Sequence, residues 1–423
     1  MKSVLTDDIF HLLQTVGDFQ IGLVMRPAAP LEADRLVRAL SELVAALPVL
    51  GCAYMPGWRR GHWEKTDQAD RQILTVLPAG NVDGQVQDFF THPVDPYTGP
   101  QIKCLLLYGG QNVLCLNVSH FVGDAVGVRE LAYSLCRAYN DPGSIKPAEH
   151  DRGLGILFKT FSCRQKLGIL GRTVRDMIVQ SPFPPSATLP AAGPGHFERQ
   201  YVIRHMGPEI TRHLKDLAAG YRATSNDVLM AAFLRALMPL APPGRRPAWR
   251  LVVTADLRRH LPPHQQSGQV RNLSGWVFTS LGRDPGRDLE DTCRHVSARM
   301  NRLKDGYLGL GMIPLCWLAV RGLPQAVTRA GMEILFPVML RRVAVAPSFT
   351  NMGRIDHRAL VFDDQPVDNA FLLAPIVYAP ILGVGISAFE DTMTLSAGFN
   401  VPGFAPTDII ALLDGIISEI RTA

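Results

Sequence analysis

A histidine and an aspartate stand four positions apart in the segment LNVSHFVGDAVG, residues 116–127. The apolar run that ends at His120 is typical of a buried strand, and the helical spacing after Asp124 predicts that this aspartate begins a helix. A histidine in such a connection can act as a base at neutral pH, because its ordinary pKa is about 6.5. The pair can equally be structural, with Asp124 as a helix cap and His120 as a satisfied polar residue at a strand end.

Three other kinds of site are disfavoured by the sequence. A metal shared by His120 and Asp124 would need a continuous helix and a third ligand, but Gly123 and the preceding strand argue against that helix. Neither a phosphate-binding G-x-x-x-x-G-K-S/T loop nor a G-x-G-x-x-G fingerprint occurs, and the G-x-S-x-G elbow of serine hydrolases is absent. We therefore expect no metal site, no nucleotide site and no serine nucleophile.

Composition indicates a globular protein of more than one domain. The chain has 423 residues, of which 47% are apolar and 19% charged. The net charge of +5 is small and no Lys/Arg block is long enough to bind nucleic acid. Seven cysteines without a C-x-x-C pair favour buried, reduced thiols. The acidic start is unlike a secretory signal, so we expect a cytoplasmic protein.

One long uncharged stretch could be mistaken for a membrane span. Residues 369–389 are about long enough to cross a bilayer, but they contain Pro375, Pro380, Gly383 and Gly385. Their β-branched and aromatic residues favour buried strands. We expect no membrane span.

The pattern of elements predicts a mixed α/β fold with two subdomains. Strands are expected at 19–27, 102–110, 112–120, 197–204, 251–258 and 272–281, and helices at 31–48, after Asp124, and at 407–422 with Thr407 as its N-cap. A basic helix and a Pro/Ala/Gly-rich stretch separate the two halves. We therefore divide the chain into an N-terminal subdomain at 1–165, a linker at 166–196 and a C-terminal subdomain at 197–423.

Several motifs resemble one known superfamily. NVSHFVGDAVGV resembles the HHxxxDG or HxxxD motif of the chloramphenicol-acetyltransferase-like superfamily, which includes condensation domains of nonribosomal peptide synthetases, wax ester synthases and HxxxD acyltransferases. Further segments resemble the family in the required order: LTDDIFHLLQ, ALPVL, TSNDVLMAAFLRAL, TADLRRHL, RNLSGWVFTSL and SFTNMGRID. The resemblance covers nearly the whole chain.

The resemblance implies an acyltransferase or condensation enzyme whose two subdomains form a V around a tunnel. The donor would be a thioester, either acyl-CoA or an acyl phosphopantetheine arm on a carrier protein, and the acceptor an alcohol or amine. It implies that no cofactor is bound and that His120 is the base. In the family the aspartate pairs with an arginine, and Arg258 is the matching candidate. We expect a monomer.

Supporting roles fall to five residues, and each has a structural alternative. Gly123 would let the backbone pass close to the thioester, or be a simple turn glycine. Ser348 and Asn351 would bond the oxyanion or acceptor, or satisfy backbone groups at a strand end. Asn272 and Trp276 would line the tunnel, although a tryptophan in an apolar strand is more often a core residue.

The chain departs from the family at two positions of the motif. Ser119 replaces the first histidine, Ala125 replaces the usual glycine, and the plant DFGWG motif is absent. The cyclisation variant of the family, which has an aspartate in place of the histidine, is disfavoured because His120 is present. A catalytically silent module that recruits a partner or carrier protein is the alternative that these departures leave open.

Overall fold

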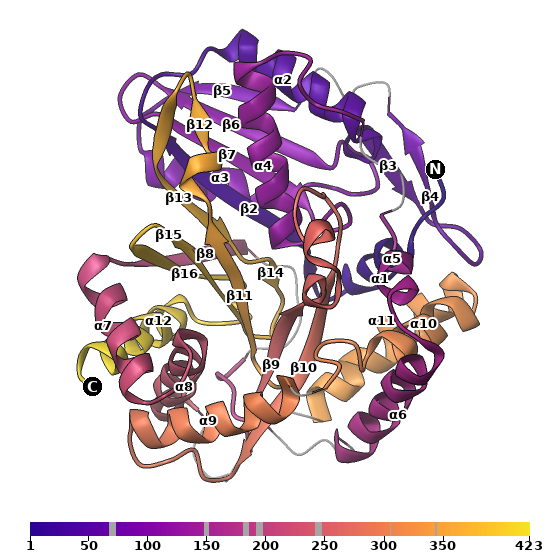
Figure 1. The fold of residues 1–423 in the computed structure, drawn as a ribbon, viewed down its shortest axis with the longest axis vertical. Coiled ribbons are helices and arrows are strands. Elements are labelled where there is room, and N and C mark those ends of the chain that lie inside the picture. Colours follow the sequence, from indigo (N-terminus) through magenta and orange to yellow (C-terminus); the bar gives the residue numbers. More distant parts are fainter. Residues whose placement is uncertain are drawn as a thin grey trace.

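A computed structural model shows a protein of two lobes, each built on its own sheet (Figure 1). The structure describes residues 1–66, 73–147, 152–180, 186–191, 198–241, 248–304, 306–342 and 345–423, without the side chains of 176–180 and 335–342. The predicted mixed α/β class is confirmed. Of the predicted linker, 181–185 and 192–196 lie outside the described residues, whereas its basic part forms a helix, α6 (Cys163–Gln180).

The N-terminal lobe contains a six-stranded sheet with the order β12-β13-β2-β7-β6-β5. Its strands are β2 (Gln20–Pro27), β5 (Leu74–Pro78), β6 (Ile102–Tyr108), β7 (Val113–Ser119), β12 (Val361–Phe362) and β13 (Gln365–Leu373). Its helices are α2 (Ala33–Ala46), α3 (Val82–Thr91) and α4 (Ala125–Asn140). Neighbouring residues of β2 face opposite sides: Leu23 belongs to the core under α2 and α4, and Val24 packs with Phe90 of α3.

The C-terminal lobe contains an eight-stranded sheet with the order β1-β14-β16-β15-β11-β9-β10, to which β8 is added beside β16. Its strands are β1 (Gly17–Asp18), β8 (Glu198–Met206), β9 (Trp249–Asp256), β10 (Ser274–Gly282), β11 (Ser348–Ile355), β14 (Ile376–Val377), β15 (Gly383–Phe389) and β16 (Thr392–Val401). Its helices are α7 (Pro208–Gly220), α8 (Ser225–Leu237), α9 (Leu289–Lys304) and α12 (Pro406–Arg421). Helix α8 is buried between α9 and α12, where Phe233 packs against Phe349 of the sheet.

The two lobes exchange strands. Strand β13, from the C-terminal part of the chain, pairs antiparallel with β2 of the N-terminal sheet. In return β1, near the N-terminus, pairs with β14 of the C-terminal sheet. Backbone hydrogen bonds therefore join the lobes on both sides, which limits how far they can move apart.

A buried charge network also joins the lobes. It lies among α1 (Leu5–Leu13), the β-hairpin of β3 (Cys52–Met55) and β4 (His62–Lys65), α10 (Ile313–Gly322) and α11 (Gln325–Arg342). Asp8 of α1 pairs with Arg321 of α10 at 2.6 Å and accepts the hydroxyl of Tyr54 at 2.6 Å. Its neighbour Asp7 pairs with Arg152 at 2.8 Å. Burial raises the pKa of Asp7, and the charge of Arg152 opposes that rise.

Two predictions about single residues at the ends of elements were wrong. Strand β9 ends at Asp256, and Arg258 lies in a 3-10 turn, because the Asp256 carboxylate accepts the Arg258 backbone N–H at 2.9 Å and bends the chain. Helix α12 begins at Pro406 with Ala405 as its N-cap, since a proline suits the first helical position, so Thr407 is not the cap.

The thiols and the apolar helices bear on two further expectations. All seven cysteines are free, and five are buried, but Cys163 at the start of α6 is exposed, contrary to the expectation of buried thiols. In the described part of the chain, none of the helices combines the length and apolarity that crossing a bilayer requires.

Candidate active site

His120 and Asp124 lie in the connection between β7 and α4, as the sequence predicts. The backbone N–H of His120 donates to Phe19 O at 2.9 Å, which continues the pairing of β7 with β2 by one residue. Asp124 is the N-cap of α4, and its carboxylate accepts the backbone N–H of Gly127 at 2.9 Å. The histidine therefore stands at the point where the rigid strand gives way to the helix.

Asp124 forms a buried, two-point ion pair with Arg258. Arg258 Nη1 lies 2.8 Å from Oδ2 of Asp124 and Nη2 lies 3.0 Å from Oδ1, and the two side chains are 4% and 3% exposed. Oδ2 also accepts the backbone N–H of Leu273 at 2.7 Å. Burial disfavours the charged guanidinium, but the carboxylates of Asp124 and Asp256 together outweigh it and raise the pKa of Arg258. The pairing implied by the family resemblance is present.

Arg258 and Asp124 are both bonded to the segment that follows Leu261 in the C-terminal half of the chain, at Arg271 and Leu273. Arg258 Nη2 donates to Arg271 O at 2.9 Å, and Arg271 O lies near Asp124 N at 3.4 Å. The segment from Arg271 to Leu273 therefore follows the turn at Asp124, although it is about 150 residues away in the chain. This brings Asn272 directly to the histidine.

The His120 ring is held from two sides. It stacks on Phe10 of α1 with the ring centroids 4.2 Å apart and the planes 20° from parallel. Asn272 Nδ2 donates to the His120 carbonyl at 2.9 Å and lies 3.2 Å from His120 Nδ1. Burial lowers the pKa of His120 to about 4, although the negative charge of Asp124 opposes this effect. The imidazole is therefore neutral at pH 7 and fixed in orientation.

Two glycines of this turn differ in the room around them. A Cβ at Gly123 would meet no atom closer than 3.5 Å, so this position is not crowded by the protein itself. A Cβ at Gly127 would lie 3.1 Å from Arg271 O and 3.3 Å from Arg271 N. Close backbone approach therefore favours glycine at 127, a position that the sequence analysis did not select.

Trp276 and Ser348 share one partly exposed face of the C-terminal sheet. Trp276 pairs with Thr254 and Phe278 with Val252, and Val252 is also the partner of Ser348. Paired residues point to the same side of a sheet. The opposite side forms the buried core, which contains Val253, Val277 and Phe349. Because β10 begins two residues after Asn272, the partly exposed face starts beside His120.

Asn351 is placed differently from the other candidates. Its Nδ2 donates to Asn226 Oδ1 at the start of α8 at 3.0 Å, and its Oδ1 accepts the Gly353 N–H at 2.9 Å. The described residues show no contact between Asn351 and His120. The structure thus brings together His120, Asp124, Arg258 and Asn272, whereas Asn351 of β11 is bonded to the start of α8.

Phe10 is a residue of this site that the sequence analysis missed. It belongs to LTDDIFHLL, which was noted only as a resemblance, and its apolar type fits any amphipathic helix. No spacing rule links Phe10 to a histidine 110 positions later. Only the packing of α1 against the end of β7 reveals the stacked pair.

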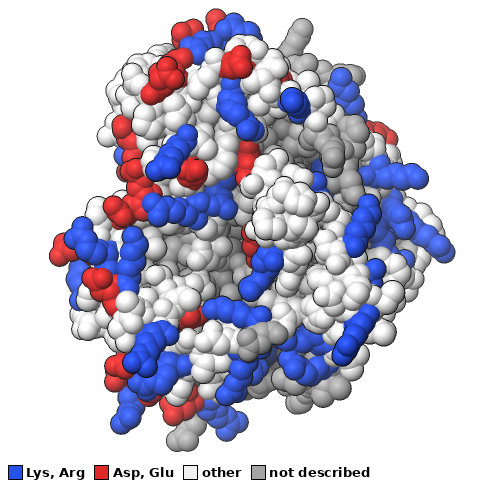
Figure 2. Space-filling model, in the orientation of Figure 1, with Lys and Arg blue, Asp and Glu red and all other residues white. Residues whose placement is uncertain are grey.

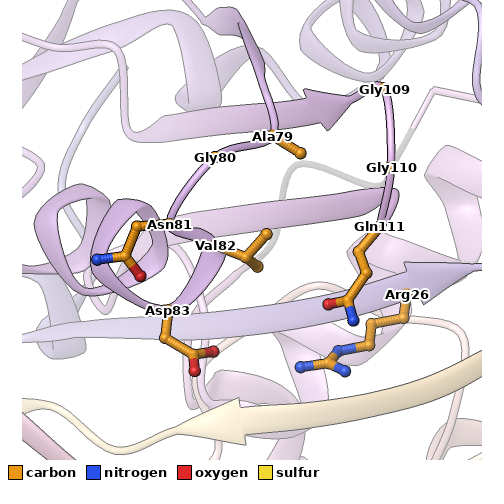
Figure 3. A pocket seen from close by; sticks show the side chains of 9 residues that line it. All are labelled: Arg26, Ala79, Gly80, Asn81, Val82, Asp83, Gly109, Gly110 and Gln111. Carbon is orange, nitrogen blue, oxygen red and sulfur yellow. The ribbon is translucent and has the colours of Figure 1, made fainter.

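An open hollow of about 540 Å³ lies at the other end of β7 (Figure 3). It is lined by Arg26, Ala79, Gly80, Asn81, Val82, Asp83, Gly109, Gly110 and Gln111. The seven residues of β7 separate it from His120, a distance of roughly 20 Å. It is therefore distinct from the site around His120. Among the described residues, no group of three or more His, Cys, Asp or Glu side chains is arranged to hold a metal.

Comparison by sequence finds no match, either to a family model or to a curated protein. Comparison by structure finds many matches. The first condensation domain of the CDA synthetase aligns with a TM-score of 0.67 at 16% identity, covering 99% of this chain and 95% of that one. Polyketide synthase associated protein 5 from Mycobacterium tuberculosis gives 0.67 at 15% identity, with 99% and 97% covered.

A third similar structure is the trichothecene 15-O-acetyltransferase of Fusarium sporotrichioides. It aligns with a TM-score of 0.69 at 13% identity, covering 99% of this chain and 94% of that one. All three alignments span both lobes, so the similarity extends over the whole architecture. The chain therefore has the two-subdomain fold that condensation domains share with chloramphenicol-acetyltransferase-like acetyltransferases.

Proposed function

We propose that this protein transfers an acyl group from a thioester to a hydroxyl or amine, with His120 as the general base. The observation that carries the proposal is the neutral His120 ring, which Phe10 and Asn272 hold above the buried Asp124–Arg258 pair. The ring is fixed in orientation and the residue is still partly exposed to solvent. A base that must reach a substrate needs both. The fold, which acetyltransferases and condensation domains share, is consistent with this chemistry.

The proton is handled by His120 Nε2. Asn272 Nδ2 lies against Nδ1 at 3.2 Å, so Nε2 is the ring nitrogen left for a substrate, and the proposal requires the tautomer with the proton on Nδ1. Nε2 takes the proton from the acceptor as its oxygen or nitrogen attacks the thioester carbonyl. The tetrahedral intermediate then collapses, the C–S bond breaks, and Nε2 returns the proton to the departing thiolate. No side chain is acylated in this scheme.

Asp124 and Arg258 are positioning residues in this mechanism. Both carboxylate oxygens are occupied by Arg258 and by the backbone of Gly127 and Leu273, so none is left for a substrate. Their role is to hold the turn that presents His120. Because the negative charge of Asp124 and the positive charge of Arg258 cancel, the pair adds no net charge beside the reaction centre.

The partly exposed face of β9, β10 and β11 is our candidate binding surface for the acyl group or acceptor. Trp276, Phe278 and Val252 give it an apolar character, and Ser348 adds a hydroxyl at its edge. Figure 2 shows the viewed surface hollowed between the two lobes. We propose that substrates reach His120 through a tunnel there, and that the donor is acyl-CoA or an acylated carrier protein.

The test is thiol release from acyl-CoAs of increasing chain length, with mixed alcohols and amines as acceptors. Acceptor-dependent release that falls by roughly a hundred- to ten-thousand-fold in His120→Ala supports the proposal. The control is His92→Ala, because the His92 side chain is 74% exposed and lies at the end of α3 in the N-terminal lobe. If no acyl-CoA is used, acylated carrier protein is tested by mass spectrometry. Absence of transfer from both donors would favour the catalytically silent module.

A further inference from the structure

The exposed apolar side chains of this protein are concentrated in one region. Fifteen large apolar side chains are exposed among the described residues, and nine of them lie at position 58, on α6, or between positions 317 and 334. Helices α6, α10 and α11 are neighbours, with α10 in contact with both others (Figure 1). Exposed apolar side chains that gather in one region of a folded domain mark an interaction surface.

Helix α6 turns an apolar stripe towards solvent. Leu167, Leu170 and Val174 are 70%, 51% and 50% exposed, and their spacing of three and four residues places them on one side of the helix. The buried residues of α6, Ile169 and Thr173, lie on another side and attach the helix to the protein. The stripe therefore has no partner within the described chain.

Helices α10 and α11 continue the patch. On α10, Trp317 and Leu318 are 55% and 59% exposed. On α11, Val327 and Ile334 are 52% and 67% exposed. A hydrogen bond from Thr328 Oγ1 to a backbone carbonyl of α10 holds the two helices together.

A hairpin tip adds an aromatic residue and two charges. Trp58 is 70% exposed and is followed by the exposed residues Arg59 and Arg60 in the connection between β3 and β4. The Gln325 backbone N–H donates to Trp58 O at 2.8 Å, and its side chain accepts the N–H of Gly57 at 2.9 Å. The tip is therefore fixed beside the first turn of α11.

The charges in this region are mainly positive. Helix α6 carries Arg164, Lys166, Arg172 and Arg175 against one acidic residue, Asp176, and α10 contains no acidic residue. On α11 the exposed acid Glu333 is bonded to Arg329 at 2.7 Å. Figure 2 shows Lys and Arg side chains standing among uncharged atoms on the side of the molecule where α6 and α10 lie in Figure 1.

We propose that this apolar and basic face, formed by α6, α10, α11 and the hairpin tip at Trp58, docks the protein onto the surface of an anionic lipid bilayer. Apolar stripes and tryptophans enter the boundary between headgroups and acyl chains, and Lys and Arg bind anionic headgroups. A bilayer fits better than a protein partner because the apolar residues are spread over three helices and a hairpin and are interleaved with cations. Such a surface suits a fluid layer, whereas a protein interface has an apolar core with charges at its rim.

The experiment is co-sedimentation of the full chain with vesicles of phosphatidylcholine alone and of phosphatidylcholine mixed with phosphatidylglycerol. Binding is expected to the mixed vesicles and to weaken as salt is added. Trp317→Asp combined with Leu318→Asp should weaken it roughly tenfold or more, and so should Leu167→Asp on α6. Arg164→Gln and Lys166→Gln should each weaken it about fivefold at low salt.

The matched control is Val37→Asp on α2 of the other lobe, where the side chain is also apolar and 42% exposed, and which should bind as the native chain does. Thermal unfolding of each variant checks that it remains folded. Absence of sedimentation with mixed vesicles overturns the proposal. A second result would also overturn it: the chain self-associates in sedimentation velocity, the same aspartate variants abolish that self-association, and vesicle binding is absent. The patch would then join two copies of the chain.

Discussion

Asp124 and Arg258 meet through two parallel contacts of 2.8 and 3.0 Å, although 134 residues separate them in the chain. The carboxylate belongs to the N-terminal half and the guanidinium to the C-terminal half. The pair therefore fastens the turn that carries His120 to the segment that carries Asn272. The geometry of the candidate site depends on contact between the two halves of the chain.

Replacing Asp124 by Asn should destabilise the fold as well as reduce activity. The buried guanidinium would lose its counter-charge and meet an amide N–H₂ group, and breaking a buried pair costs about 3–5 kcal/mol. The free energy of unfolding in urea measures this loss. Asp256→Asn is the control, because Asp256 lies 3.2 Å from the same arginine but is 49% exposed, and it should cost less than about 1 kcal/mol. Equal losses in the two variants would contradict the prediction.

The pH dependence of kcat/KM should show His120 in its neutral form throughout the physiological range. A general base is active when unprotonated, and burial lowers the pKa of His120 from 6.5 to about 4. The acidic limb of the profile should therefore fall near pH 4, with full activity above about pH 5. Asn272→Asp, which puts a carboxylate beside Nδ1, should move this limb towards neutral pH. A limb at pH 6–7 in the native protein would show that His120 is not desolvated as described.

The two glycines around Asp124 should respond differently to alanine. Gly123→Ala adds a methyl group with no neighbour nearer than 3.5 Å, so it should change the free energy of unfolding by less than about 1 kcal/mol. Gly127→Ala brings the methyl within 3.1 Å of Arg271 O and should separate the N-cap from the 271–273 segment, at a cost of about 1–3 kcal/mol. Urea unfolding distinguishes them, and a larger loss in Gly123→Ala would count against the structure.

The buried pair of Asp8 and Arg321 should control the attachment of α10. Arg321→Met leaves the carboxylate of Asp8 with neutral partners only, which are Ser3, Tyr54, Gly61 and Gln325. The change should cost about 3–5 kcal/mol. Hydrogen exchange should then increase in α10 and α11 before it increases in β2 or β7. Arg294→Met is the control, because its pair with Glu290 is exposed and lies within α9. Uniform exchange throughout the chain would contradict a local role.

The site was predictable from the sequence where it depends on neighbours in the chain. The apolar run before His120 and the helical spacing after Asp124 predicted β7 and α4, because each element satisfies its own backbone groups locally. The cap on α4 follows from the same local rule, since Asp124 bonds the N–H of Gly127 three residues later. Family resemblance, and no spacing rule, selected Arg258 as the partner of Asp124.

Tertiary structure alone decided the parts that join distant segments. Phe10 stacks on His120 because α1 packs at the end of β7, and glycine is favoured at 127 because the backbone of Arg271 approaches it closely. Strand register separated two candidates that the sequence treated alike: Ser348 faces the same side as Trp276, whereas Asn351 is bonded at the start of α8. Periodicity records which residues of a segment share a face, but only the packing of the two lobes decides what that face meets.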